Sequence, residues 1–219
     1  MRCRMRGSVL IASSGRKMQR SEPTEAQGRA FWTIGAVVVL ADAFTKVVAV
    51  DALSPVYLPR RVIGETLRLT LVYNPGAAFG LHLGPWSRGI FMVLTVIALV
   101  VLWQLHRASR AGDWLRTVAV ALVCGGAVGN LLDRLKSSRG VVDFIDVGIG
   151  SARWPTFNVA DIAVTCGAVL LAIVLWQEDM RDRSEAAQSV PSSAADLPAP
   201  AALEANAEGA HGTDAAIHS

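Results

Sequence analysis

Residues 89–106 read GIFMVLTVIALVVLWQLH, and no charged side chain interrupts them between Gly89 and Leu105. A helix needs roughly 17–25 mostly apolar residues to cross the hydrocarbon core of a bilayer, so this stretch alone predicts a membrane-spanning helix. Three further stretches are long and apolar enough for the same role, at residues 31–50, 114–132 and 157–177. The sequence therefore predicts an all-α membrane protein built as a bundle of four transmembrane helices.

The composition of the whole chain agrees with this class. Of its 219 residues, 52% are hydrophobic, and the mean hydropathy is +0.39. Indole rings prefer the headgroup level of a bilayer, and all six tryptophans fall at or near the ends of the predicted spans. Three cysteines are too few for a disulfide framework. No nucleic-acid partner is expected, because the excess basic residues lie mostly in one terminal segment and form no patterned face.

Both ends of the chain are polar. Residues 1–30 carry seven basic and two acidic side chains, and we expect a disordered basic tail, with translation starting at Met1 or at Met18. Residues 179–219 are rich in Ala, Ser, Pro and acidic side chains, a composition typical of disordered segments. The membrane domain is therefore predicted to span residues 31–178.

Basic residues beside the spans predict the orientation of the chain. Cytoplasmic loops of membrane proteins carry an excess of Lys and Arg. Here basic side chains precede the first span, flank the short connection between the second and third, and follow the fourth. The opposite segments, residues 51–88 and 134–157, hold four basic residues each, so the bias is moderate. On this basis both termini are placed in the cytoplasm.

Antiparallel spans bring the unusual polar residues to one membrane surface. Ionisable groups within or beside a span are costly and usually mark function. With four spans, the end of the first, the loop after it, the end of the third and the start of the fourth share one face. The polar residues found there are Asp42, Lys46, Asn74, Asn130, Asp133, Arg134, Asp143, Asn158 and Asp161. We therefore expect a site at that surface.

Several of these residues also have a purely structural interpretation. Asp42 and Lys46 are four residues apart on a helix and can neutralise each other, which we favour over a bracing role in the site. Asn158 and Asp161 have the spacing of a helix N-cap and its acidic partner. Asn74 begins an Asn-Pro-Gly sequence, which is typical of a turn.

The end of the third span combines small and polar residues in the sequence CGGAVGNLLDR at residues 124–134. Gly125 and Gly129 form a GxxxG face, which lets helices approach one another closely. Asn130, Asp133 and Arg134 follow on one side of the helix end. For Asp133 we favour an ion pair with Arg134 that anchors the helix at the membrane interface.

The loops hold one predicted strand and two further carboxylates. Residues 67–73 alternate Leu and Tyr with Arg, Thr and Val, which predicts a strand followed by a turn. Asp143 and Asp146 lie in the sequence GVVDFID, in the outward loop before the fourth span, and no polar partner is evident for Asp146. If Asp143 lies beside Asp161, each carboxylate changes the chemistry of the other.

Five motifs together resemble the lipoprotein signal peptidases, also called signal peptidase II. ADAFTK, YNPGAAFG, GGAVGNLLDR, VVDFID and FNVAD occur here in the order and spacing of that family, over about residues 31–178. The resemblance implies a four-helix aspartic peptidase of the bacterial inner membrane with a small extracytoplasmic β-element. It also implies that the enzyme removes signal peptides from prolipoproteins on the amino side of a diacylglyceryl-modified cysteine, within membrane phospholipid.

The same resemblance implies roles for individual residues. The Asp of the VVDF motif and the Asp of the FNxAD motif form the catalytic pair of the family, and they correspond to Asp143 and Asp161. Residues that match positions lining the family's site are Asn74, Asn130, Arg134 and Asn158, with Asp42 and Lys46 as supporting residues. The clients, the oligomeric state and the use of the two tails are not indicated.

The chemistry of two close carboxylates agrees with this assignment. Such a pair shares a proton near neutral pH, because two adjacent negative charges repel. The ionised member takes a proton from the attacking water, and the protonated member donates to the carbonyl oxygen. No metal or other cofactor is required, and which Asp holds the proton stays open.

Two other classes use acidic residues inside membranes. A small transporter or proton channel predicts acids near the midplane and often internal repeats, whereas here the acids gather at one surface and the spans show no repeat. Intramembrane aspartic proteases of the presenilin or prepilin-peptidase kind carry a GxGD motif. The nearest stretch in this chain is GAVGN, at residues 126–130.

Overall fold

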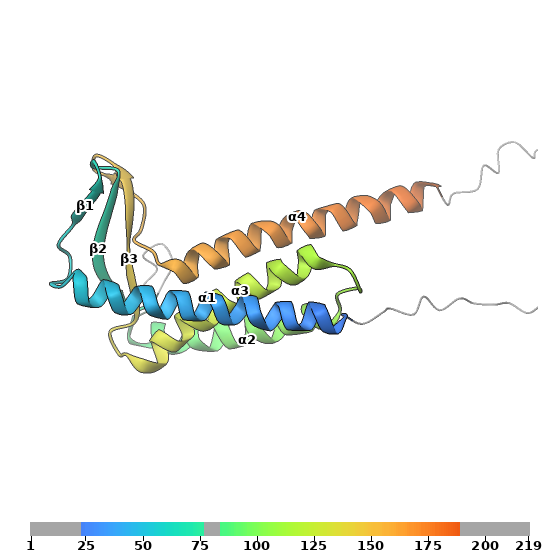
Figure 1. Cartoon of the computed structure of the whole chain (residues 1–219), viewed down its shortest axis with the longest axis horizontal. Coiled ribbons are helices and arrows are strands. Elements are labelled where there is room, and N and C mark those ends of the chain that lie inside the picture. The colour runs from blue at the N-terminus through green and yellow to red at the C-terminus, as the bar shows by residue number, and fades with distance from the viewer. Residues whose placement is uncertain (1–22, 77–83, 189–219) are drawn as a thin grey trace, which may run out of the picture. The chain divides into compact units, whose positions relative to one another are not determined.

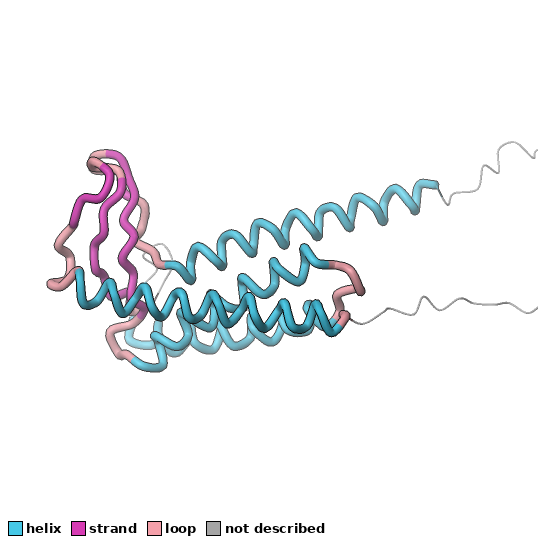
Figure 2. The backbone as a smooth tube through the Cα atoms, in the orientation of Figure 1, coloured by secondary structure: helices cyan, strands magenta, loops and turns pink. Residues whose placement is uncertain are grey.

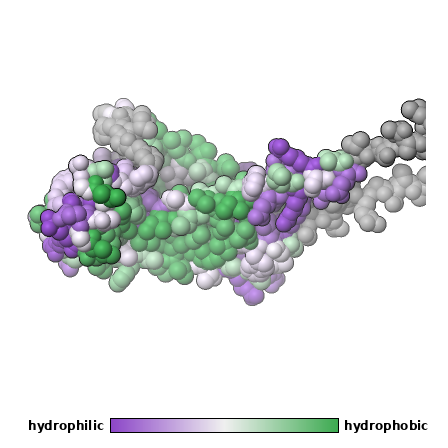
Figure 3. Space-filling view, turned by 90° about the horizontal axis from the view of Figure 1, so that it is seen from above, coloured by the Kyte–Doolittle hydropathy of each residue, from purple (hydrophilic) through white to green (hydrophobic). Residues whose placement is uncertain are grey.

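The computed structural model describes residues 23–76 and 84–188, which form four long helices and one small sheet (Figure 1). The helices are α1 (Glu25–Ala52), α2 (Ser87–Arg107), α3 (Trp114–Lys136) and α4 (Val159–Gln188). Each is long and apolar enough to cross a membrane, so the four predicted spans are confirmed. Hydrophobic side chains gather over the surface of these helices in Figure 3, as expected of a surface that faces lipid.

Two helices run into segments that the sequence predicts as disordered tails. The start of α1 at Glu25 is fixed by a capping box, in which the Thr24 hydroxyl accepts from the Gln27 backbone and the Gln27 side chain accepts from the Thr24 backbone. The end of α4 is helical as far as Gln188, and an ion pair of 2.9 Å joins Arg183 to Asp179 there. The remainder of both predicted tails, residues 1–22 and 189–219, lies outside the described residues.

The sheet is antiparallel, with its strands in the order β1-β2-β3-β4 (Figure 2). The strands are β1 (Arg60–Ile63), β2 (Leu67–Asn74), β3 (Val141–Ile149) and β4 (Ala152–Arg153). A short 3-10 turn, η2 (Gly84–Trp86), comes after β2 and directly before α2. The predicted strand at residues 67–73 is confirmed as β2. The expectation of an outward loop around Asp143 is wrong, because the β-branched run VVDFIDVGI pairs with β2 over most of its length.

Glycines in α3 set how closely the helices pack. An added Cβ on Gly125 would lie 2.8 Å from the Val38 Cβ of α1, and one on Gly126 would overlap the Ala160 carbonyl of α4. One on Gly129 would lie 2.6 Å from an Asp42 carboxylate oxygen. The predicted close packing of the GxxxG face is thus confirmed, and it involves both α1 and α4.

A glycine also sets the approach of β3 to β2. Gly140 precedes β3 with a positive φ of 100°, a backbone conformation that residues other than glycine rarely adopt. An added Cβ there would overlap the carbonyl of Asn74, the last residue of β2. Beyond this contact the core residues Phe144 and Leu71 pack against Ala49 and Leu53 at the end of α1. The sheet is therefore fixed to α1 close to the predicted site.

We expect Gly126→Ala to destabilise the protein, because the new methyl group overlaps the α4 backbone. Overpacking a tight contact typically costs about 1–3 kcal/mol. The matched control is Gly28→Ala in α1, where nothing lies within 4 Å of the added Cβ. Thermal unfolding in detergent should show a lowered midpoint for Gly126→Ala only. Equal midpoints for the two variants would contradict this account of the packing.

Candidate active site

Asp143 and Asp161 reach one site from two different elements. Asp143 lies on β3 with 2% of its surface exposed, and Asp161 lies in the first turn of α4. Asn158 joins them: its Nδ2 donates to Asp143 Oδ1 at 2.7 Å, and its backbone N–H donates to Asp161 Oδ2 at 3.2 Å. The Asp161 N–H donates in return to Asn158 Oδ1 at 2.9 Å. Asn158 is therefore both the predicted helix cap and the link between the two carboxylates.

Asn130 and Asn74 hold the outer sides of the two carboxylates. Asn130 donates its Nδ2 to Asp161 Oδ1 at 2.8 Å, and its Oδ1 accepts from Asn158 Nδ2 at 3.1 Å. Asn74 donates its Nδ2 to Asp143 Oδ2 at 3.2 Å, while its Oδ1 accepts from the Gly76 N–H at 3.1 Å. Asn74 is thus a turn former and a site residue at once.

Beneath the two carboxylates, Lys46 is a buried cation with three partners. Its Nζ lies 2.7 Å from Asp42 Oδ2, 2.7 Å from Asp133 Oδ2 and 3.0 Å from Asn130 Oδ1. The predicted Asp42–Lys46 ion pair is confirmed. The preference for a purely local role is wrong, because the same ammonium group also orients the Asn130 amide that contacts Asp161.

The ion pair expected between Asp133 and Arg134 is absent from the described residues. Asp133 pairs with Lys46 and accepts from the Val142 N–H at 3.2 Å. Arg134 instead donates Nη1 to the Asn130 carbonyl at 3.1 Å. Consecutive residues on a helix point in different directions, so two neighbours in sequence make poor partners. Asp133 therefore ties α3 to α1 and β3, and Arg134 remains on the side of the site.

Asp146 has partners that the sequence does not indicate. It is 9% exposed, accepts from Thr70 Oγ1 at 3.2 Å and from Arg153 Nε at 2.8 Å, and lies opposite Arg68 in the sheet. Asp146 is therefore a buried structural anion between β2 and β4, on the face of β3 opposite to Asp143.

The eight residues named for the site form one connected network. Hydrogen bonds and ion pairs link Asn74 to Asp143, then Asn158, Asn130 and Lys46, with branches to Asp161, Arg134 and Asp42. Two contributors were missed by sequence reasoning. The Ala160 N–H donates to Asp42 Oδ1 at 2.9 Å, and Gly140 permits the contact with Asn74. The glycine directly before the VVDFID run is the only sequence signal for either.

The surroundings of Asp143 favour its protonated form. Burial is the largest influence, followed by the negative charge of Asp161, and together they raise the pKa of Asp143 to about 7. Hydrogen bonds from Asn74 and Asn158 and the charge of Lys46 act in the opposite direction. Near neutral pH the Asp143 carboxyl can therefore hold or release a proton. Asp161 accepts a hydrogen bond on each of its two carboxylate oxygens.

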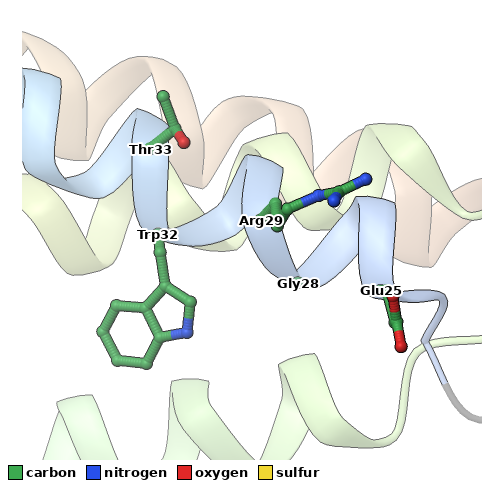
Figure 4. Close-up of a pocket in the computed structure, with 5 residues that line it drawn as sticks. All are labelled: Glu25, Gly28, Arg29, Trp32 and Thr33. Atoms are coloured by element: carbon green, nitrogen blue, oxygen red, sulfur yellow. The ribbon is translucent and has the colours of Figure 1, made fainter.

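A hollow on the first turns of α1 lies apart from this network (Figure 4). It is lined by Glu25, Gly28, Arg29, Trp32 and Thr33, all from α1. Trp32 is 64% exposed, and its ring centroid lies 5.6 Å from that of Trp103 on α2. None of the residues named for the site lines this hollow. The indole rings of Trp32 and of the neighbouring Trp103 suit the headgroup level of a bilayer.

Comparison with known proteins gives a consistent match. The family model for Signal peptidase (SPase) II matches residues 34–177. A lipoprotein signal peptidase of Cupriavidus taiwanensis is 43% identical over 140 residues, 63% of this chain and 77% of that protein. Its counterpart in Cupriavidus necator is 39% identical over 164 residues, 73% of this chain and 91% of that protein.

Solved structures agree with the sequence matches. Two structures described as a bacterial membrane enzyme, determined by the in meso method, are each 30% identical to this chain. The first has a TM-score of 0.64 and covers 73% of this chain and 93% of its own. The second has a TM-score of 0.60 and covers 71% and 96%.

We expect Lys46→Met to destabilise the protein strongly, because it leaves the carboxylates of Asp42 and Asp133 without their cation. Removing one partner of a buried ion pair typically costs about 3–5 kcal/mol. The control is Arg61→Met, which breaks the ion pair between Arg61 and Glu65. The Arg61 side chain is 71% exposed, so this substitution should cost about 0–1 kcal/mol of stability. Thermal unfolding in detergent measures both. A Lys46→Met protein as stable as Arg61→Met would show that the buried cation is dispensable.

Proposed function

Because the chain belongs to the signal peptidase II family, which removes signal peptides from prolipoproteins, we propose that it cleaves them as an aspartic endopeptidase. Membership makes the chain a membrane peptidase that acts on lipoprotein precursors. The proposal adds that Asp143 and Asp161 are the catalytic residues and that the cut falls on the amino side of a diacylglyceryl-modified cysteine. The observation that carries it is the pair of carboxylates joined through Asn158.

In the first step, the two carboxyl groups act in opposite protonation states. Asp161 takes a proton from a water molecule as the water oxygen attacks the scissile carbonyl carbon. Asp143, whose pKa is raised to about 7 by burial and by the charge of Asp161, donates in its protonated form to the carbonyl oxygen as negative charge develops there. The product is a tetrahedral diol in which the water oxygen and the former carbonyl oxygen share one carbon.

In the second step, the diol collapses and the C–N bond breaks. A proton from the Asp161 carboxyl passes to the nitrogen of the lipid-modified cysteine, which leaves as an amine. Asp143 regains its proton from the diol hydroxyl, so both groups return to their starting states. The signal peptide is released with a carboxyl terminus, and no metal or cofactor takes part in either step.

The remaining site residues position these groups. Asn130 and Asn158 hold the Asp161 carboxylate by two donors, and Lys46 fixes the Asn130 amide through its oxygen. Asn74 contacts Asp143 from the end of β2, where a bound peptide would pass. Arg134 has a buried Nε with no hydrogen-bond partner among the described residues, and this donor suits a substrate carbonyl.

The position of the site suits a lipid-modified substrate. Asp161 is the third residue of α4, so it lies about 3 Å inside the helix at 1.5 Å per residue. This depth suits a scissile bond at the membrane surface, with the diacylglyceryl chains in the bilayer beside the exposed apolar faces of the helices. A prolipoprotein without the lipid should therefore be a poor substrate.

We also propose that the site faces away from the cytoplasm, in the inner membrane of a bacterium. The Gln27 side chain of α1 hydrogen-bonds to the Arg110 carbonyl at 3.2 Å, so the start of α1 and the α2–α3 connection lie at one end. That end carries Arg29, Arg107 and Arg110, which favours a cytoplasmic location. The sheet and the carboxylate pair lie at the other ends of the same helices.

We expect Asp143→Asn and Asp161→Asn each to abolish cleavage, because an amide keeps the shape of the side chain but cannot cycle a proton. Acid–base catalysis typically contributes about 10²–10⁴-fold per group, and the double variant should be no worse than either single one. The assay incubates purified protein with a diacylglyceryl-modified prolipoprotein and identifies the cleavage site by mass spectrometry.

The control for this series is Asp51→Asn, an exposed carboxylate at the end of α1 near the sheet. It should retain full turnover. A folded Asp143→Asn or Asp161→Asn protein with substantial turnover would overturn the pair as the catalytic residues. Equal cleavage of lipidated and unmodified precursors would remove the lipid requirement while leaving the pair intact.

The pH dependence of cleavage should follow the pKa of Asp143. Its carboxyl is protonated below about pH 7 and ionises as the pH rises through that value, so kcat/KM should fall on the alkaline side with a midpoint near 7. Asn74→Ala removes a hydrogen bond that stabilises the carboxylate, so the pKa should rise and the midpoint should move to higher pH. A midpoint unchanged in Asn74→Ala would contradict this assignment of the proton.

A further inference from the structure

One face of the sheet becomes progressively uncovered with distance from the site. Side chains alternate between the two faces of a strand, so Asp143, Ile145, Val147 and Ile149 of β3 lie on the same face. Asp143 is 2% exposed and buried in the site, Ile145 and Val147 are half-buried, and Ile149 is 80% exposed. The strand therefore ends in apolar side chains with little protein against them.

The register of the sheet extends this bare face across its neighbours. Val147 pairs with Leu67 of β2, and Leu67 pairs with Ile63 of β1, which is 65% exposed. Residues paired directly across an antiparallel ladder lie on one face. Ile63, Leu67, Val147 and Ile149 thus form one apolar cluster, here named the sheet tip. Arg60 shares this face, because it pairs with Leu69, which pairs with Ile145.

Contacts at the site fix the direction in which this face points. Asp143 projects from it to Asn158, the cap of α4, and α4 continues from there as a membrane span. The face that carries the sheet tip is therefore the one that looks toward the start of α4, whereas close to the site the opposite face packs Phe144 against the end of α1. The opposite face has a different character: Arg61 pairs with Arg68, which pairs with Asp146, and Glu65 forms ion pairs with both arginines.

We propose that the sheet tip inserts into the bilayer leaflet beside the site, at the boundary between headgroups and acyl chains. The occupant is phospholipid, because the bare face is apolar, lies on the side of the sheet where α4 begins its membrane span, and is continuous with the half-buried Ile145. Arg60 supplies a cation at headgroup level for phosphate. Trp154 donates its backbone N–H to the Val147 carbonyl at 2.8 Å, and its indole, 60% exposed, suits the same level.

This contact gives one strand two functions. Ile149 lies about 20 Å along β3 from Asp143, at about 3.3 Å per residue. The bilayer thus supports the far end of the strand whose near end carries Asp143, while α4 holds Asp161 directly in the membrane. The inference depends on the chain being a membrane protein and not on the catalytic assignment.

Depth-dependent fluorescence quenching tests the proposal. In a full-length background with Cys3, Cys124 and Cys166 changed to Ala, single variants Ile63→Cys and Ile149→Cys are labelled with an environment-sensitive dye. The protein is reconstituted in vesicles of phosphatidylcholine and phosphatidylglycerol that contain lipids spin-labelled near the top of the acyl chain. The matched control is Arg61→Cys, two residues from Ile63 but on the opposite face, because the register of β1 shifts between Arg61 and Ile63.

We expect lipid quenching at positions 63 and 149 to exceed that at position 61 at least threefold, with the reverse order for a water-soluble quencher. Equal quenching at all three positions would overturn the proposal. Efficient disulfide cross-linking between Ile149→Cys chains, without lipid quenching, would overturn it too and would assign the face to a second copy. Repeating the measurement with Asp161→Asn separates this result from catalysis, because no activity is needed.

Discussion

The ammonium group of Lys46 is the interaction on which the rest of the site depends. It lies between the carboxylates of the buried Asp42 and the half-buried Asp133, and its contact with the Asn130 oxygen fixes the Asn130 amide. Asp42 then accepts from the start of α4, and Asp133 accepts from the start of β3. One cation therefore holds together α1, α3, α4 and the sheet, which are the four elements that carry site residues. Hydrophobic residues in place of all three charged groups would let the helices pack but would not specify this alignment, whereas loss of the cation alone leaves two carboxylates without their partner.

Close packing makes this charge network possible. The glycines of α3 let the backbones of α1 and α4 approach within contact of it, so short side chains such as Asp42 and Asn130 can reach across two helix interfaces. Gly140 has the same effect between β3 and β2, where it brings Asn74 within 3.2 Å of Asp143. The small residues and the polar residues of the motifs therefore depend on each other. The small residues let the backbones approach closely, and the short polar side chains can then reach one another across the interfaces.

Much of the fold and the membership of the network could be predicted from the sequence, because both rest on strong local signals. Long apolar runs mark spans, and ionisable residues inside spans are too costly to be accidental. The sequence does not predict which charged residues pair with one another. The sequence favours Arg134 as the partner of Asp133, but the cation comes from α1, and it indicates no partner for Asp146, which pairs with Arg153. Such pairs are made by tertiary packing, which no local spacing encodes. The strand β3 is not predicted, because two carboxylates interrupt its apolar residues and only its pairing with β2 buries them.

The alternation of β3 makes its register all-or-none. Asp143 faces the site and Phe144 faces the core beside α1, so a shift of β3 by a single residue would present a phenyl ring to Asp161 and drive a carboxylate into apolar packing. A shift by two residues would restore the faces but move every side chain by about 7 Å, too far for Asn158 to reach. A β3 strand paired in a shifted register would therefore not bring Asp143 to the site at all. A change of chain length between Gly140 and Asp143 would shift Asp143 out of the site, whereas a change in the turn at residues 150–151 lies beyond the far end of β3 and would leave the register near the site intact.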